Sequence, residues 1–359
     1  MPSLGDTLAA LGSGDGVMTH VRTAAYFAAF LGALGGVTVF YPWRRVWRFR
    51  PLALSIATPY SLAALLATWR LILAFFVHHT QRYAGHPDPP NLFVDAYREV
   101  CDDAAGWCWS CVLLSWVCVA CPLADAEARR ARLQPRLVAL FVTLAFLGAV
   151  SLAFPLLLLL LTVASDSKGA LLPTQRVWLW PSCLALALAS TAALPLTVDG
   201  PKWAFITALA LLHVILIFPF AAALASPYPG TPPSPPLLSA RSQYLALACV
   251  SLVLHLASLA AAWRDAPLPP NQSNTSTGAA FLWHLVSATW RNEAQASISI
   301  DAVLASLAGA GYMLARGGWR ALPLVAVAPI VSPAAALAIF AAVNTVQTSA
   351  AEQRRPHTS

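Results

Sequence analysis

The feature that most constrains this chain is the length of its apolar runs. Stretches such as 137–163 and 203–224 are nearly free of charged residues. A helix needs roughly 20 apolar residues to cross the ~30 Å hydrocarbon core of a bilayer, where backbone amides must pair within a helix or a closed barrel. The runs are continuous and lack the short alternating pattern of barrel strands. The sequence therefore predicts an all-α, polytopic integral membrane protein.

We expect about nine transmembrane helices in one domain over 1–359, with a polar segment at 1–22 and a disordered tail at 351–359. Composition agrees, because only 10% of residues are charged, against roughly 25% in soluble proteins. The first apolar run is too long for a cleavable signal peptide. The expected spans are 23–42, 52–77, 105–123, 137–163, 177–196, 203–224, 243–263, 296–315 and 322–346.

Arginines in two connections set the expected orientation. They are Arg44, Arg45, Arg48 and Arg50 in the first connection, and Arg129, Arg130, Arg132 and Arg136 in the third. Basic connections face the cytosol, so the N-terminus is expected outside and the C-terminus inside. The net charge of +7 then reflects topology and attraction to anionic lipid, and it gives no support to a nucleic-acid partner. We expect the endoplasmic reticulum or another endomembrane; the sequence does not set the oligomeric state.

Two glycosylation sequons disagree with this topology. They begin at Asn271 and Asn274, and such sites require a luminal loop. Nine spans place that loop in the cytosol. Either the sequons are chance matches in a polar linker, or the count is wrong by one helix.

Asp301 is the carboxylate that a membrane disfavours most. It lies early in the expected span 296–315, where a charge costs a few kcal/mol even on the lower insertion scales. It should face the bundle interior or a polar cavity, with Ser297 and Glu293 one and two turns earlier on the same face. Asp301 is either a functional acid, a structural hydrogen-bond partner between helices, or a residue nearer the interface than this span implies.

Arg70 is a second charged residue within an expected span. It would neutralise a carboxylate or hold an anionic part of a ligand, unless the second span ends near it. Many of the tryptophans fall at span ends, as in an ordinary aromatic belt. Trp69 and Trp107 do not, and they are candidates for contact with a substrate.

An acidic stripe precedes the third span. Asp95, Glu99, Asp102 and Asp103 recur at helical spacing in a segment that we expect to form a short interfacial helix. The stripe could bind Mg²⁺, but it lacks the third acid of a DDxxD motif, so a solvated helix face is the alternative. We expect no metal, and treat Asp95 and Glu99 as polar contacts for a substrate.

Five of the seven cysteines are clustered, and the cluster resembles a zinc site only in its CxxC spacing. They are Cys101, Cys108, Cys111, Cys118 and Cys121. Both CxxC pairs would lie on one helix, ~15 Å apart, so one tetrahedral site cannot collect them. We expect packing residues, with S-palmitoylation of Cys118 and Cys121 as the alternative.

The stretch Trp290-Arg-Asn-Glu-Ala-Gln-Ala-Ser-Ile-Ser-Ile-Asp-Ala-Val-Leu304 resembles a pattern, NPAxSxxxxDA, in a group of fungal polytopic membrane proteins. Some members are membrane-bound terpene cyclases of meroterpenoid pathways, which cyclise a prenylated aromatic compound. Glu293-Ala294 stands where the pattern has Pro-Ala, and the likeness covers about fifteen residues.

The resemblance implies acid-initiated carbocation cyclisation of a prenylated aromatic compound or another lipophilic isoprenoid. Asp301 would be the acid, and Glu293 would support it or act as the final base. Aromatic faces would stabilise the cation. No motif for a redox cofactor, a Walker loop or a nucleophile elbow is present, so no cofactor is expected. The alternatives are a multi-pass transporter or non-enzymatic membrane protein, and an enzyme that uses Mg²⁺ at the acidic stripe.

Overall fold

The computed structural model describes residues 14–84, 86, 90–131, 133–164, 179–198, 200–225, 239–266 and 274–353. Within these residues every regular element is a helix and no strand occurs, which confirms the all-α prediction. Residues 1–13 and 354–359, Arg132 and Asn271 lie outside the described residues, as does the side chain of Asn274. Residues 351–353 of the expected tail belong to the last helix.

Six helices are long and apolar enough to cross a membrane, or seven if the bent pair α2–α3 is one span. They indicate an integral membrane protein. The pair α2 (Gly14–Phe40) and α3 (Trp43–Phe49) is bent by 55°. The other six are α4 (Pro51–Arg82), α6 (Ala104–Arg130), α9 (Leu179–Thr197), α10 (Lys202–Ala225), α11 (Ala240–Asp265) and the stretch Glu293–Val331, which holds α13 (Glu293–Gly317), a 3₁₀ turn and a further short helix.

Helix α6 forms the centre of the bundle. It contacts α8, α9, α11, α13 and α15, and 83% of its apolar stretch is buried. Cys108, Cys111, Cys118 and Cys121 are buried free thiols on this helix, which agrees with the packing interpretation. Cys118 and Cys121 have no exposed surface, so neither thiol is accessible for palmitoylation.

The expected span 137–163 is instead a hairpin of two half-length helices, α7 (Pro135–Leu147) and α8 (Val150–Ala164). The Tyr41 ring lies 5.8 Å from the Phe141 ring, and the Tyr41 hydroxyl donates to the Leu156 carbonyl at 3.2 Å. Residues 141 and 156 would be about 22 Å apart along one continuous helix. Helices α7 and α8 therefore fold back on one another, and both contact Tyr41 at the bend between α2 and α3.

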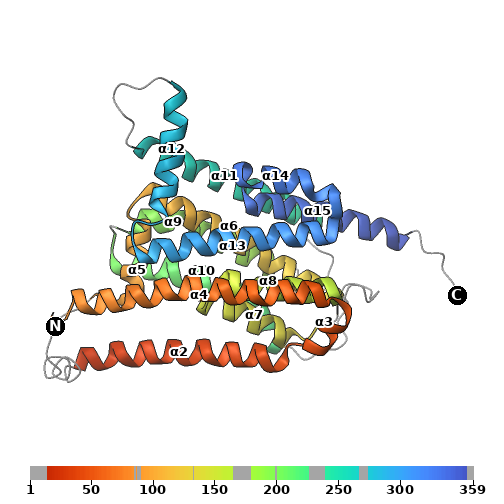
Figure 1. The fold of residues 1–359 in the computed structure, drawn as a ribbon, viewed down its shortest axis with the longest axis horizontal. Coiled ribbons are helices and arrows are strands. Elements are labelled where there is room, and N and C mark those ends of the chain that lie inside the picture. The colour runs from red at the N-terminus through yellow and green to blue at the C-terminus, as the bar shows by residue number, and fades with distance from the viewer. Residues whose placement is uncertain are drawn as a thin grey trace.

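A second hairpin follows α13. The 3₁₀ turn η1 (Gly318–Ala321) leads into α14 (Leu322–Val331), and after Ser332 the chain returns as α15 (Pro333–Gln353). The Phe340 ring lies 6.1 Å from that of Tyr312, so α15 returns to the C-terminal part of α13 (Figure 1). The expected span 322–346 is thus also divided in two. The described structure does not bear out nine simple crossings.

The two ends of the bundle are chemically different. One end, the α5 end, holds α5 (Leu92–Cys101), the start of α6 and α12 (Asn274–Ala288). The other, the α3 end, holds α3 and the start of α7, so both arginine-rich connections share it. Ala105, Ala262 and Ala288 form one buried cluster at the α5 end. The C-terminal end of α11 therefore lies opposite the basic connections. Nine crossings would place it at the same end as them, and hairpin α7–α8 removes one crossing before it.

Candidate functional site: a pocket at the α5 end

A cavity of about 670 Å³ opens between the last turns of α4, helix α5 and the start of α13. We call it the α4–α13 pocket. Its wall is apolar at Leu71 and Phe75 and becomes polar toward the end of α4. Its lining residues are Leu71, Phe75, His78, His79, Gln81, Arg82, Glu99, Trp290, Arg291, Asn292, Glu293 and Ala296.

A His–Glu pair joins the two walls of this pocket. His78 Nδ1 lies 2.8 Å from Glu293 Oε1, and the side chains are 56% and 33% exposed. Glu293 is the first residue of α13, which begins here because the Asn292 side chain accepts the Gln295 N–H at 2.7 Å. An acid in the first turn is also favoured by the helix dipole. An imidazole–carboxylate pair of this kind can hold and transfer a proton.

Two acids of the stripe pair with arginines, and a third lies beside a histidine ring. Glu99 accepts from Arg82 at 2.9 Å, and Asp95 lies 3.4 Å from the His79 ring. Asp103 pairs with Arg291 at 2.6 Å and also caps α6 by accepting the Gly106 N–H at 2.8 Å. Asp102 is exposed. Among the described residues no three His, Cys, Asp or Glu side chains gather as metal ligands.

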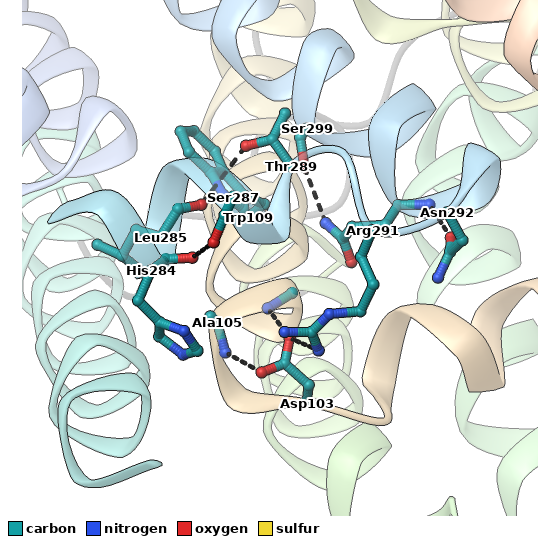
Figure 2. A network of polar contacts seen from close by, with 12 residues as sticks. Asp103, Ala105, Trp109, His284, Leu285, Ser287, Thr289, Arg291, Asn292 and Ser299 are labelled. Carbon is teal, nitrogen blue, oxygen red and sulfur yellow. Dashed lines mark hydrogen bonds and ion pairs between the residues drawn. The ribbon is translucent and has the colours of Figure 1, made fainter. Parts of the chain in front are cut away.

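The turn between α12 and α13 is fastened to the start of α6 (Figure 2). Trp109 Nε1 donates to the Leu285 carbonyl at 3.0 Å, and Arg291 reaches down to Asp103. Inside α13, the Gln295 amide donates to Ser299 Oγ at 2.8 Å. These bonds hold Trp290 to Glu293 beside α4, and so they position one wall of the pocket.

Asp301 lies away from the pocket, at the tip of the α7–α8 hairpin. Its side chain is only 7% exposed, and its two oxygens accept the N–H groups of Val150 at 2.9 Å and Ser151 at 2.7 Å. These are the first residues of α8, whose N–H groups have no partner within the helix. A carboxylate satisfies both donors and complements the positive end of the helix dipole. Asp301 is therefore an N-terminal cap supplied by another helix.

Two aromatic residues hold the other side of this tip. Trp69 Nε1 donates to the Gly148 carbonyl at 3.1 Å, and the Tyr26 hydroxyl donates to the Leu147 carbonyl. The Trp69 ring stacks on Phe30 with 4.2 Å between centroids. The break between α7 and α8 is thus fastened from α2, α4 and α13.

The residues singled out in the sequence divide among separate places. Glu293 and Glu99 line the pocket. Asp95 does not line it, but lies 3.4 Å from the lining residue His79. Asp301 and Trp69 meet at the hairpin tip instead. A further two lie in neither place: Arg70, which is exposed and makes no hydrogen bond or ion pair with a described residue, and Trp107, which is buried in the first turn of α6.

Sequence reasoning missed the part that His78, Arg82 and Trp290 take in the pocket. The partner of His78, Glu293, is 215 residues away in the sequence. Trp290 stands at the start of the resemblance motif without a role there. A local pattern cannot show such a pairing, which depends on how α4 and α13 pack.

No protein-family model matches this chain, and neither a curated protein nor a solved structure matches it. The fold defines a class of protein: a helical membrane protein with two interior hairpins and a polar pocket at the α5 end. Its function must be inferred from the chemistry of that pocket.

Proposed function

We propose that this chain is a membrane-embedded enzyme that rearranges a lipophilic isoprenoid by proton transfer in the α4–α13 pocket. A terpene cyclase acting on a prenylated aromatic compound is the specific form of the proposal. The observation that carries it is the His78–Glu293 pair, which lines the same pocket as the aromatic side chains Phe75 and Trp290. A cavity of about 670 Å³ is large enough for such a substrate.

The chemistry needs no cofactor. The protonated pair gives its proton to an alkene carbon or an epoxide oxygen of the substrate, and a carbocation forms. A neighbouring double bond closes the ring by attacking this cation, and loss of a proton from carbon to the pair restores the starting state. Product and substrate are then isomers. Trp290 and Phe75 offer π faces to the cation.

Glu293, and not Asp301, fits the part of proton donor in this structure. Glu293 is partly exposed on the pocket wall and contacts a proton-bearing ring. Both oxygens of Asp301 accept backbone N–H groups and Asp301 does not line the pocket, so this residue supports the fold. We assign Asp301 a positioning role through hairpin α7–α8.

The test is expression of the chain beside a pathway that makes a prenylated phenol, followed by mass spectrometry of the products. A new product of unchanged mass is expected with the wild type. Glu293→Gln should lower product formation by about 10²-fold or more, the usual contribution of general acid catalysis. Glu99→Gln is the matched control: this acid also lines the pocket but is paired with Arg82, and activity should stay within a few-fold. A fully active Glu293→Gln variant would refute the mechanism.

A transporter is the second candidate, and the two hairpins favour it. Transporter sites are commonly built at broken helices whose ends meet within the membrane, as at Gly148 and Ser332. In proteoliposomes a transporter would move the prenylated phenol across the bilayer and leave it chemically unchanged. Catalytic conversion without net movement would exclude this alternative.

For topology we propose seven crossings and two hairpins, in the endoplasmic reticulum or another endomembrane. The α3 end, with its arginine-rich connections, faces the cytosol. The α5 end and the pocket then face the lumen. This arrangement keeps the expected orientation of both termini, because the two hairpins remove two crossings together.

A further inference from the structure

Helix α12 has two different faces. Phe281, Leu285 and Ala288 pack toward the bundle, where the ring of Phe281 lies 4.8 Å from that of Trp263. The opposite face is open and apolar. Its large side chains are strongly exposed: Leu282 63%, Trp283 72%, Val286 49% and, just past the helix, Trp290 63%.

Helix α12 is oriented across the spanning helices. In Figure 1 the spans run along the length of the molecule, whereas α12 runs across them at the α5 end and projects beyond their side. Its 15 residues make about 22 Å of helix, too short for the ~30 Å hydrocarbon core. Because the bilayer normal follows the spans, α12 lies parallel to the membrane plane.

Arg70 gives the depth of the membrane boundary independently. It is exposed on the outer face of α4, and a lipid-facing arginine is stable only near the interface. Helix α4 has 32 residues, about 48 Å, so it extends well past a ~30 Å core. Its last turns, from Leu71 to Arg82, therefore begin at the level of the lipid head groups and extend about 17 Å from there toward water. The turn after α12 packs against these turns around the pocket.

We propose that α12 rests in the interface of the bilayer leaflet at the α5 end, with Leu282, Trp283 and Val286 directed toward the acyl chains. Tryptophan favours this region because its ring is apolar and its N–H can remain hydrated. Trp290 belongs both to this exposed face and to the pocket wall. The pocket mouth therefore opens beside the lipid head groups.

Spin labels on α12 in vesicles of neutral phospholipid test the proposal. Labels are placed by Trp283→Cys and Val286→Cys in a background that lacks Cys249 and Cys101. Leu62→Cys, exposed on α4 about 12 Å from Arg70 on the side away from the α5 end, marks the bilayer interior, and Asp102→Cys marks the aqueous phase. For each label, accessibility to oxygen is compared with accessibility to a water-soluble nickel complex.

Labels at 283 and 286 should be accessible to oxygen and at least several-fold less accessible to nickel than the label at 102. The depth of both labels in the bilayer should fall between that of the label at 102 and that of the label at 62. Nickel accessibility equal to that at position 102 would overturn the proposal, because α12 would then stand in water. Protection from both reagents would overturn it as well, because a protein surface, such as a second copy of the chain, would then cover this face. Neither result depends on catalytic activity.

Discussion

The Asp301→Asn variant tests whether the Asp301 carboxylate stabilises the fold or donates a proton to the substrate. The two carboxylate oxygens accept the N–H groups of Val150 and Ser151. An Asn side chain keeps one oxygen and turns an NH₂ group toward the other N–H, so one charge-assisted bond is lost and a buried donor has no acceptor. Such a bond contributes about 1.5–3 kcal/mol, and the unpaired donor costs about 1–3 kcal/mol. The amide is easier to desolvate than a carboxylate, which offsets part of this loss.

We therefore expect Asp301→Asn to destabilise the protein by about 2–4 kcal/mol. In detergent this lowers the melting temperature by on the order of 5 °C. Asp102→Asn, on an exposed residue of the α5–α6 turn, should melt like wild type. Hydrogen exchange gives a local measurement: amide protection around Val150 and Ser151 should fall in the Asp301 variant and remain in the control.

The opposite outcome would refute this reasoning. If Asp301→Asn melts and exchanges like wild type but makes no cyclised product, the carboxylate is a proton donor, as the sequence resemblance implies. Loss of stability with retained turnover would instead support the cap. Asp301→Ala removes both acceptors and should be more severe than Asn in both measurements.

Three further predictions concern other parts of the chain. Gly148→Ala should lower the melting temperature, because a Cβ there would lie 2.6 Å from a phenylalanine ring of α2; Gly311→Ala, with open space, should not. Burial raises the pKa of the Cys101 thiol to about 12, so maleimide labelling at pH 8 should be roughly a thousandfold slower than for an ordinary cysteine. The stability linked to this neutral thiol is present below pH ~8.5 and is lost as the pH rises toward 12. Expression in eukaryotic cells should add a glycosidase-sensitive glycan at Asn271 or Asn274, and cytosolic labelling of a cysteine placed there would contradict the topology.

The candidate site was only partly predictable from sequence. Glu293 and Glu99 were singled out from the sequence as candidates, and both line the pocket; their roles remain predictions. Asp301 was identified as a buried carboxylate, but its partners on α8 were not, because the N–H groups of Val150 and Ser151 become free only where the helix breaks. The pairing of Glu293 with His78 likewise depends on the packing of α4 against α13.

The sequence by itself determined the helical class and the approximate position of the apolar segments, because segment length and hydropathy set the cost of burying a backbone in lipid. It also placed the two arginine-rich connections at one end. Whether 137–163 and 322–346 cross the membrane or turn back was decided only by the tertiary structure. Both hairpins are as apolar as a span, and the difference lies in contacts far apart in sequence, such as Asp301 with Ser151 and Trp69 with Gly148. Hydropathy does not record such contacts, which satisfy the open helix ends that a turn inside the bundle requires.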